Sequence, residues 1–196
     1  MSRWLAATSV TPNQISIASM AFAALARAAF WGVGHSDGAL RVFLLVVAAL
    51  GCQARLVCNL MDGLVAVEAG KQASDGPFWN EFPDRVADIM IIAGPGLAVG
   101  QPALGWAAAT MAVLAAYTRE LGRTCGQGAD YSGPMAKPQR MALGTGAAAL
   151  TCLEPLWDGE GGVLWAALWV LLLGTAATVV RRGARIVTQL LAREEG

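Results

Sequence analysis

Charged residues are scarce in this chain. Of its 196 residues only 14% are Asp, Glu, Lys or Arg, 56% are hydrophobic, and the formal net charge is zero. A soluble domain averages roughly 25% charged residues, and the mean hydropathy of +0.50 is correspondingly high. This shortage of charge argues against one large soluble core and predicts an all-α integral membrane protein. No nucleic-acid partner is expected.

Several other features are missing. The cysteines show no CxxC or ligand-like spacing, so we interpret them as packing residues. The chain lacks internal repeats, low-complexity tracts and long linkers, so residues 1–196 are expected to form a single domain. No clear cleavage site follows the first apolar segment, which favours a membrane span over a cleaved signal peptide. The four cysteines are Cys52, Cys58, Cys125 and Cys152.

Long apolar segments, by contrast, are plentiful. A helix needs about 20 apolar residues to cross the hydrocarbon of a bilayer, and six segments qualify. We predict six transmembrane helices and, over residues 1–8, a short N-terminal interfacial helix with Trp4 and Leu5 against lipid. The predicted spans are 14–34, 39–60, 86–102, 103–122, 139–156 and 161–180.

The basic residues are distributed unevenly about these spans. Segments 61–85, 119–140 and 181–196 would share one side of the membrane, and they hold most of the Lys and Arg residues. Because loops rich in Lys and Arg stay on the cytoplasmic side, we expect both termini in the cytoplasm. Membrane lipids are expected to surround the protein.

One stretch, "NLMDGLVAVEAGKQASDGPFWNEFPDRVAD" over residues 59–88, concentrates the acidic residues. Asn59 and Asp62 lie three apart and would share a helix face. Asn80, Asp84 and Asp88 lie four apart each and would share a face of the next helix. Oxygen ligands facing one another across two helices are typical of a site for Mg²⁺ or Mn²⁺. Burying several carboxylates near a membrane without a cation would be very costly.

The other acids of the stretch, Glu68, Asp75 and Glu81, fit a solvated loop. Small and basic residues near the predicted metal site indicate a ligand that contains phosphate. Gly63 and Ala66 leave space beside Asp62, and Arg55 lies one turn before Asn59.

Four more basic residues flank the next cytoplasmic loop, and "GPMAKPQRM" leads directly into a predicted helix. Cations near a helix start favour anion binding. A role only in membrane topology is the alternative for these four, which are Arg119, Arg123, Lys137 and Arg140.

The stretch resembles the signature of the class I CDP-alcohol phosphatidyltransferases. That signature runs Asp, two residues, Asp-Gly, two residues, Ala-Arg, about eight residues, Gly, three residues, Asp, three residues, Asp. Here Asn59 and Asn80 stand at the first and third aspartates, and Val67 stands at the arginine, as in a divergent bacterial branch. The positions in register are Asn59, Asp62, Gly63, Ala66, Val67, Gly76, Asn80 and Asp84.

A second register is also possible. It makes Asp84 and Asp88 the third and fourth aspartates, but it needs a longer gap and puts Asn80 at the glycine. An asparagine still offers a carbonyl oxygen to a metal ion, and Asp88 would restore one charge a turn further on. Under either register Asp84 and Asp88 face the same seam between helices.

The resemblance implies a function. It implies a homodimer with a cytoplasmic active site between the second and third spans, where a phosphatidyl group passes from CDP-diacylglycerol to an unidentified polar alcohol and CMP is released. Mg²⁺ or Mn²⁺ would hold the diphosphate, and Asp84 would be the general base. The implied metal ligands are Asn59, Asp62, Asn80, Asp84 and Asp88. The donor-binding residues would be Arg55, Gly63, Ala66 and Gly76, and the acceptor-binding residues Arg119, Arg123, Lys137 and Arg140.

Two alternatives remain open. The asparagines and Val67 also fit a catalytically impaired member of the family that binds a nucleotide-lipid or a membrane partner. A transporter is disfavoured, because the acids cluster at one membrane face and not at the midplane.

Overall fold

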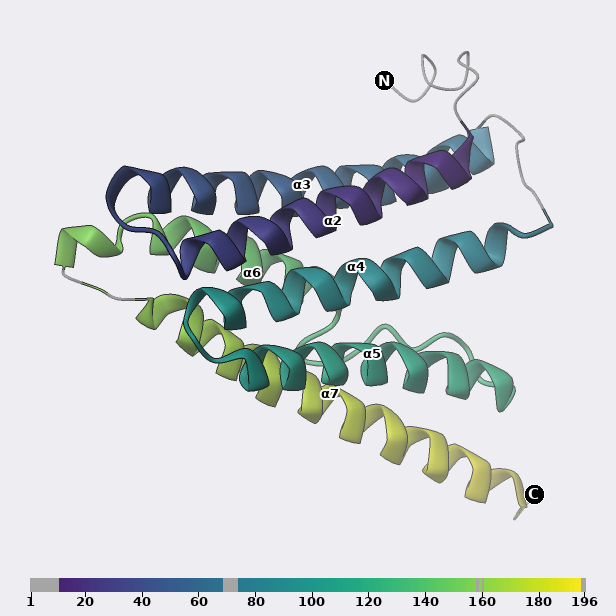
Figure 1. The fold of residues 1–196 in the computed structure, drawn as a ribbon. Coiled ribbons are helices and arrows are strands. Elements are labelled where there is room, and N and C mark those ends of the chain that lie inside the picture. Colours follow the sequence, from purple (N-terminus) through teal and green to yellow (C-terminus); the bar gives the residue numbers. More distant parts are fainter. Residues whose placement is uncertain (1–10, 69–73, 158, 160, 195–196) are drawn as a thin grey trace.

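The computed structural model describes residues 11–68, 74–157, 159 and 161–194; within helices, the side chains of residues 62–68, 77, 80 and 194 are also outside the description. These residues form an all-helical structure without strands (Figure 1). The helices are α2 (Pro12–Val33), α3 (Gly38–Glu68), α4 (Gly76–Ala98), α5 (Pro102–Thr124), α6 (Lys137–Thr151), the short 3₁₀ helix η1 (Glu154–Trp157) and α7 (Gly162–Glu194).

The predicted all-α class is confirmed, and each of the six α-helices overlaps one predicted span. Two helices run furthest beyond their predicted spans. Helix α4 begins at Gly76 and not at 86, because its polar first turns continue the helix beyond the apolar segment, and α7 continues to Glu194, past the predicted end at 180. Three helices of the described chain are long and apolar enough to cross a membrane, at Pro12–Val33, Gly38–Met61 and Gly162–Arg193. The six-span count and the cytoplasmic termini stay predictions, and the expected interfacial helix over 1–8 lies outside the described residues.

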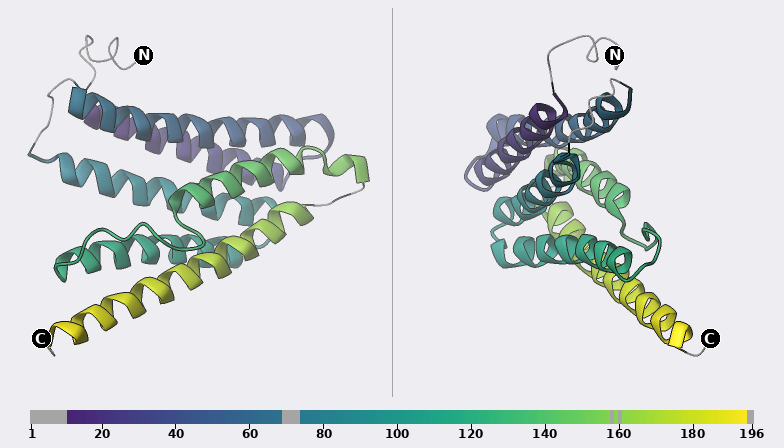
Figure 2. Two further views of the ribbon diagram at one scale, coloured as in Figure 1. Left: turned by 180° about the vertical axis from the view of Figure 1, so that it is seen from behind. Right: turned by 90° about the vertical axis from the view of Figure 1, so that its right-hand side faces the viewer.

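The helices form one bundle in which neighbours in sequence are mostly neighbours in space. Helix α2 packs on α3 and α4, α5 packs on α4 and α7, and the short α6 packs on α3 and α7. The start of α2, the end of α3, the start of α4 and the ends of α5 and α7 gather at the same end of the bundle (Figures 1 and 2). The described parts of the acidic stretch, in the last turns of α3 and the first half of α4, therefore lie at the end of the bundle where α2 starts and α7 ends.

Small residues allow the close packing of α4 on α5. A Cβ atom on Gly96 would lie 2.8 Å from the Cα atom of Gly105 and 2.8 Å from the carbonyl oxygen of Gln101. The two helices are joined by a tight turn in which Gly100 has a φ of 66°, a conformation that favours glycine. Close approach of helix backbones through small residues is typical of membrane helix pairs.

Hydrogen bonds made by side chains of α7 fix the segment that precedes α6. The Arg182 side chain is 5% exposed; its Nε donates to the Ser132 carbonyl at 3.0 Å and its Nη1 to the Ala115 carbonyl at 2.7 Å. The Met135 amide donates to Thr178 Oγ1 at 3.0 Å. These bonds join α5, the 125–136 segment and α7, and so they position the start of α6.

An ion pair supports the same segment, since Arg185 Nη1 lies 2.8 Å from Asp130 Oδ2. Partial burial acts to raise the pKa of the Asp130 carboxyl, but hydrogen bonds from Ser132 and the nearby Arg185 and Arg182 guanidiniums outweigh it and hold that pKa below its usual range. Asp130 is therefore ionised at neutral pH and pairs with Arg185 there.

The glycine contact predicts a stability effect. Gly96→Ala should destabilise the protein by about 1–3 kcal/mol through overpacking. The matched control is Gly144→Ala, because a Cβ on Gly144 of α6 meets nothing within 4 Å; it should be neutral or stabilising by up to about 1 kcal/mol through helix propensity. Thermal unfolding in detergent measures both, and equal shifts would contradict the packing argument.

Candidate functional site

The candidate site lies where α3, α4 and α6 meet. Each helix contributes two side chains, spaced so that both fall on one helix face: four apart on α3 and α4, and three apart on α6. We call this cluster the seam; its residues are Arg55, Asn59, Asp84, Asp88, Lys137 and Arg140.

Arg55 is at the centre of the seam. Its side chain is 0% exposed, and its Nη2 atom lies 2.9 Å from Asp84 Oδ1 and 3.0 Å from Asp88 Oδ1. The same nitrogen lies 3.4 Å from the Asp84 carbonyl oxygen. One guanidinium nitrogen thus contacts both carboxylates, because the two aspartates are one turn apart on α4.

Helix α6 supplies the remaining cations. Lys137 Nζ forms an ion pair with Asp84 Oδ2, and Arg140 Nη2 lies 3.3 Å from Asp88 Oδ2. Arg85 adds a longer contact of 3.5 Å to Asp84 Oδ2. All four carboxylate oxygens of the two aspartates therefore contact a cationic side chain.

Asn59 completes the seam. Its amide satisfies both neighbours when it is oriented so that Nδ2 donates to Asp84 Oδ1 at 2.5 Å and the carbonyl oxygen accepts from Lys137 Nζ at 3.2 Å. This orientation is assigned because it gives both the amide nitrogen and the amide oxygen a hydrogen-bond partner. The asparagine therefore hydrogen-bonds to one anion and one cation at once, which an aspartate could not do.

The charges of the described seam do not cancel. Two carboxylates, those of Asp84 and Asp88, face the cations Arg55, Lys137 and Arg140. Buried carboxylates need such partners, because an unpaired buried charge is strongly destabilising. The surplus positive charge makes the seam attractive to an anion.

A metal ion fits this arrangement poorly. A hard cation such as Mg²⁺ needs oxygens that are free to coordinate it, whereas the oxygens of Asp84 and Asp88 are engaged by Arg55, Lys137 and Arg140. Among the residues that the structure describes, no group of three His, Cys, Asp or Glu residues is placed to hold a metal. The part of the predicted ligand set with described side chains does not fit a resident divalent ion.

A cationic pocket of about 310 Å³ adjoins the seam. Arg119, Lys137 and Arg140 line it, so it brings together three of the four predicted acceptor-binding residues. Arg119 also pairs with Glu81 at 2.7 Å and lies over the ring of Tyr131. The fourth predicted residue, Arg123, does not line this pocket and pairs with Glu120 at the surface.

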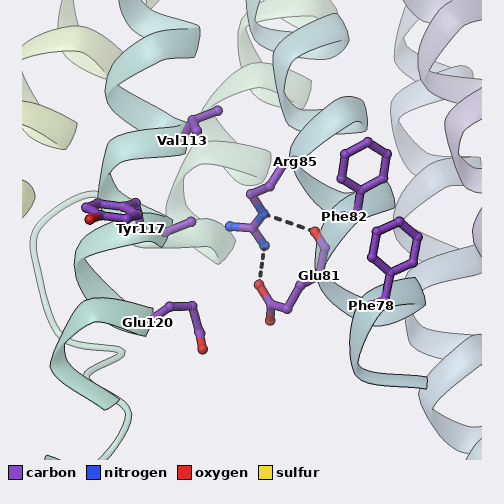
Figure 3. Close-up of a pocket in the computed structure, with 8 residues that line it drawn as sticks. Phe78, Glu81, Phe82, Arg85, Val113, Tyr117 and Glu120 are labelled. Atoms are coloured by element: carbon purple, nitrogen blue, oxygen red, sulfur yellow. Dashed lines mark hydrogen bonds and ion pairs between the residues drawn. The ribbon is translucent and has the colours of Figure 1, made fainter. Parts of the chain in front are cut away.

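Two mainly apolar hollows flank the charged groups. One of about 340 Å³ lies between α4 and α5 and is lined by Phe78, Phe82 and Tyr117, with the Arg85–Glu81 pair in its wall (Figure 3). The other, of about 350 Å³, lies between α3 and α6 and reaches Asn59 and Lys137. Lys137 therefore lines both this α3–α6 hollow and the cationic pocket.

The remaining predicted site residues lie at the adjoining helix ends. Asp62, Gly63 and Ala66 are in the last turns of α3, where only the backbone is described, and the Asn80 side chain is likewise outside the description. Gly76 is the first residue of α4. The predicted meeting of Asp62 and Asp84 at one ion therefore stays a prediction.

Sequence reasoning missed the site roles of Arg85, Tyr131 and Arg182. Each lines the cationic pocket. Arg85 directly follows Asp84, which is a signal that could have been used. Tyr131 and Arg182 reach the pocket only through the packing of the 125–136 segment on α7, for which the sequence carries no local signal.

No protein-family model matches the chain. The inner membrane protein YnbA of Escherichia coli K12 is 27% identical over 180 residues, which are 88% of this chain and 84% of YnbA. This similarity and the three long apolar helices together support a membrane protein.

Two solved structures of Mycobacterium tuberculosis phosphatidylinositol phosphate synthase (PgsA1) superpose on the chain. The complex with manganese and citrate gives a TM-score of 0.78 at 16% identity, over 95% of this chain and 87% of the synthase. The structure with CDP-DAG bound gives 0.75 at 17% identity, over 94% and 90%. The chain shares their fold.

The buried ion pairs predict a large stability effect. Asp88→Asn should destabilise the protein by about 3–5 kcal/mol, because Arg55 and Arg140 would lose a buried counterion. Asp37→Asn, in the exposed turn between α2 and α3, is the control and should stay within about 0.5 kcal/mol. Thermal unfolding in detergent compares the two, and an unchanged melting temperature for Asp88→Asn would show that the pairs are energetically unimportant.

Proposed function

We propose that the chain is an integral membrane phosphatidyltransferase. It transfers the phosphatidyl group of CDP-diacylglycerol to the hydroxyl of a polar alcohol and releases CMP, as a step of phospholipid synthesis. The observation that carries the proposal is that Asp84, at a signature position, meets Lys137 of α6 beside a cationic pocket. The fold is that of a synthase solved with CDP-DAG bound.

The seam and the hollows beside it are the proposed binding site of the CDP-diacylglycerol donor. Its acyl chains suit the apolar hollows on either side, and its diphosphate suits the surplus cations of the seam. Charge-assisted hydrogen bonds from Arg and Lys to phosphate are among the strongest in proteins. Gly63, Ala66 and Gly76 are proposed to leave room for the cytidine end.

The reaction is a phosphoryl transfer. The acceptor oxygen bonds to the lipid-linked phosphorus while the bond from that phosphorus to the CMP oxygen breaks, and Asp84 accepts the proton of the acceptor hydroxyl. A bound diphosphate competes with Asp84 for Lys137, so binding of the donor removes the Lys137 ion pair and leaves Asp84 Oδ2 with only the longer contact to Arg85, which makes this oxygen available as the base. Lys137 then stabilises the charge on the departing CMP.

The proposal includes a bound Mg²⁺ or Mn²⁺ ion. Asp62 and Asn80 are two of its predicted ligands, and their side chains lie outside the described part of the structure. When bound, such an ion would neutralise diphosphate charge. A homodimer in a bacterial inner membrane, with termini and active site facing the cytoplasm, is proposed on the resemblance and on the basic loops.

A second candidate function follows from the same contacts. Because cations engage every oxygen of Asp84 and Asp88, and because Asn59 replaces an aspartate, the chain could bind a nucleotide-lipid without turning it over. This candidate belongs to a different class, that of non-catalytic binding proteins.

The decisive assay measures CMP release. Purified protein is incubated with labelled CDP-diacylglycerol, Mg²⁺ or Mn²⁺, and a panel of alcohols that includes glycerol phosphate, inositol phosphate and serine. Asp84→Asn should lower turnover by about 10²–10⁴-fold through loss of the base, while Asp37→Asn should leave it unchanged.

Other outcomes of this assay are equally informative. Activity that survives Asp84→Asn but is lost in Asp88→Asn would support the second register. CDP-lipid binding without CMP release from any alcohol would establish the non-catalytic alternative.

The cationic pocket predicts a difference between two arginines. Arg119→Gln should weaken binding of glycerol phosphate by about tenfold, which corresponds to the loss of one charge-assisted contact of about 1.4 kcal/mol. Arg123→Gln is the matched control, because Arg123 is exposed and lies outside the pocket. Isothermal titration of both variants tests this, and equal losses would contradict the assignment of the pocket to the acceptor.

A further inference from the structure

We propose that the guanidinium of Arg55 is the built-in cation of the Asp84–Asp88 pair, in the position where a divalent ion would otherwise bridge the two carboxylates. Asp84 and Asp88 then hold no metal, and any divalent ion that the protein binds is held elsewhere. The proposal rests on the proposed function and refines its metal requirement.

The first argument is the position of one atom. Nη2 of Arg55 lies 2.9 Å from an oxygen of Asp84 and 3.0 Å from an oxygen of Asp88. A single positively charged group thus contacts both carboxylates, as a bridging ion would. The planar guanidinium carries five N–H donors and no acceptor, which suits it to contact two carboxylates at once.

The second argument is enclosure. The side chains of Arg55 and Asp88 are 0% and 1% exposed, and Arg55 Nη1 contacts the Met141 sulfur of α6 at 3.8 Å. The guanidinium is therefore buried among three helices, and its described contacts are with α4 and α6. Arg55 is a structural cation here, and the diphosphate of a donor meets Lys137 before it meets Arg55.

The third argument is the charge around the pair. A divalent ion placed between Asp84 and Asp88 would lie beside Arg55, Lys137 and Arg140, and like charges at such distances repel strongly in a low-dielectric interior. The amide at Asn59 removes one further negative charge that could offset this repulsion. Asp88 lies one turn beyond the last aspartate of the signature in the first register, and it serves as the partner of Arg55 and Arg140.

Metal binding tests the proposal without reference to turnover. Purified full-length protein in detergent is titrated with Mn²⁺ alone, and free Mn²⁺ is counted by electron paramagnetic resonance. Arg55→Met, which keeps most of the side-chain volume without the charge, should bind one more Mn²⁺ per chain than the wild type, and Mn²⁺ should raise its melting temperature more than that of the wild type. The control is Arg27→Met on α2, where Arg27 lies over the Trp106 ring; it should leave the Mn²⁺ count unchanged.

A folded Arg55→Met that binds no additional Mn²⁺ would overturn the proposal. If Arg55→Met does not fold, the wild type and Asp84→Asn are compared directly. Equal Mn²⁺ binding by these two supports the proposal, and loss of a bound Mn²⁺ in Asp84→Asn refutes it. The proposed function is tested separately by CMP release. If no CMP is released, the proposed function fails, but the number of bound Mn²⁺ ions still tests the role of Arg55.

Discussion

The contact of Arg55 with Asp84 and Asp88 is the interaction on which the arrangement of the seam depends. It joins α3 to α4 inside an apolar bundle, where an unpaired buried carboxylate would be strongly destabilising. Lys137 and Arg140 then join α6 to the same two aspartates. Three helices are thus held together by charges that would each be costly to bury without the others.

A fourth helix determines where those charges meet. Arg182 on α7 bonds to the carbonyls of Ser132 and Ala115, which fixes the segment before α6 and therefore the start of α6 itself. Lys137 and Arg140 lie in the first turn of that helix. The seam is built from α3, α4 and α6, but its position depends on α7.

The features that could be predicted from sequence are those with a local signal. Apolar runs locate the helices, and the four-residue spacing of Asp84 and Asp88 places them on one face. The sequence placed Arg55 near the site, but it could not show that the guanidinium pairs with both Asp84 and Asp88 of α4; its predicted role in donor binding stays a prediction. The spacing of Asn80, Asp84 and Asp88 predicted a helix that begins before the apolar span, but its start at Gly76 carries no apolar signal, because the first turns are polar.

Lys137 lines the hollow between α3 and α6 and also the cationic pocket. The same side chain pairs with Asp84. A substitution at Lys137 therefore alters the walls of both spaces and the environment of Asp84 at once, so its effects on one space cannot be separated from its effects on the other.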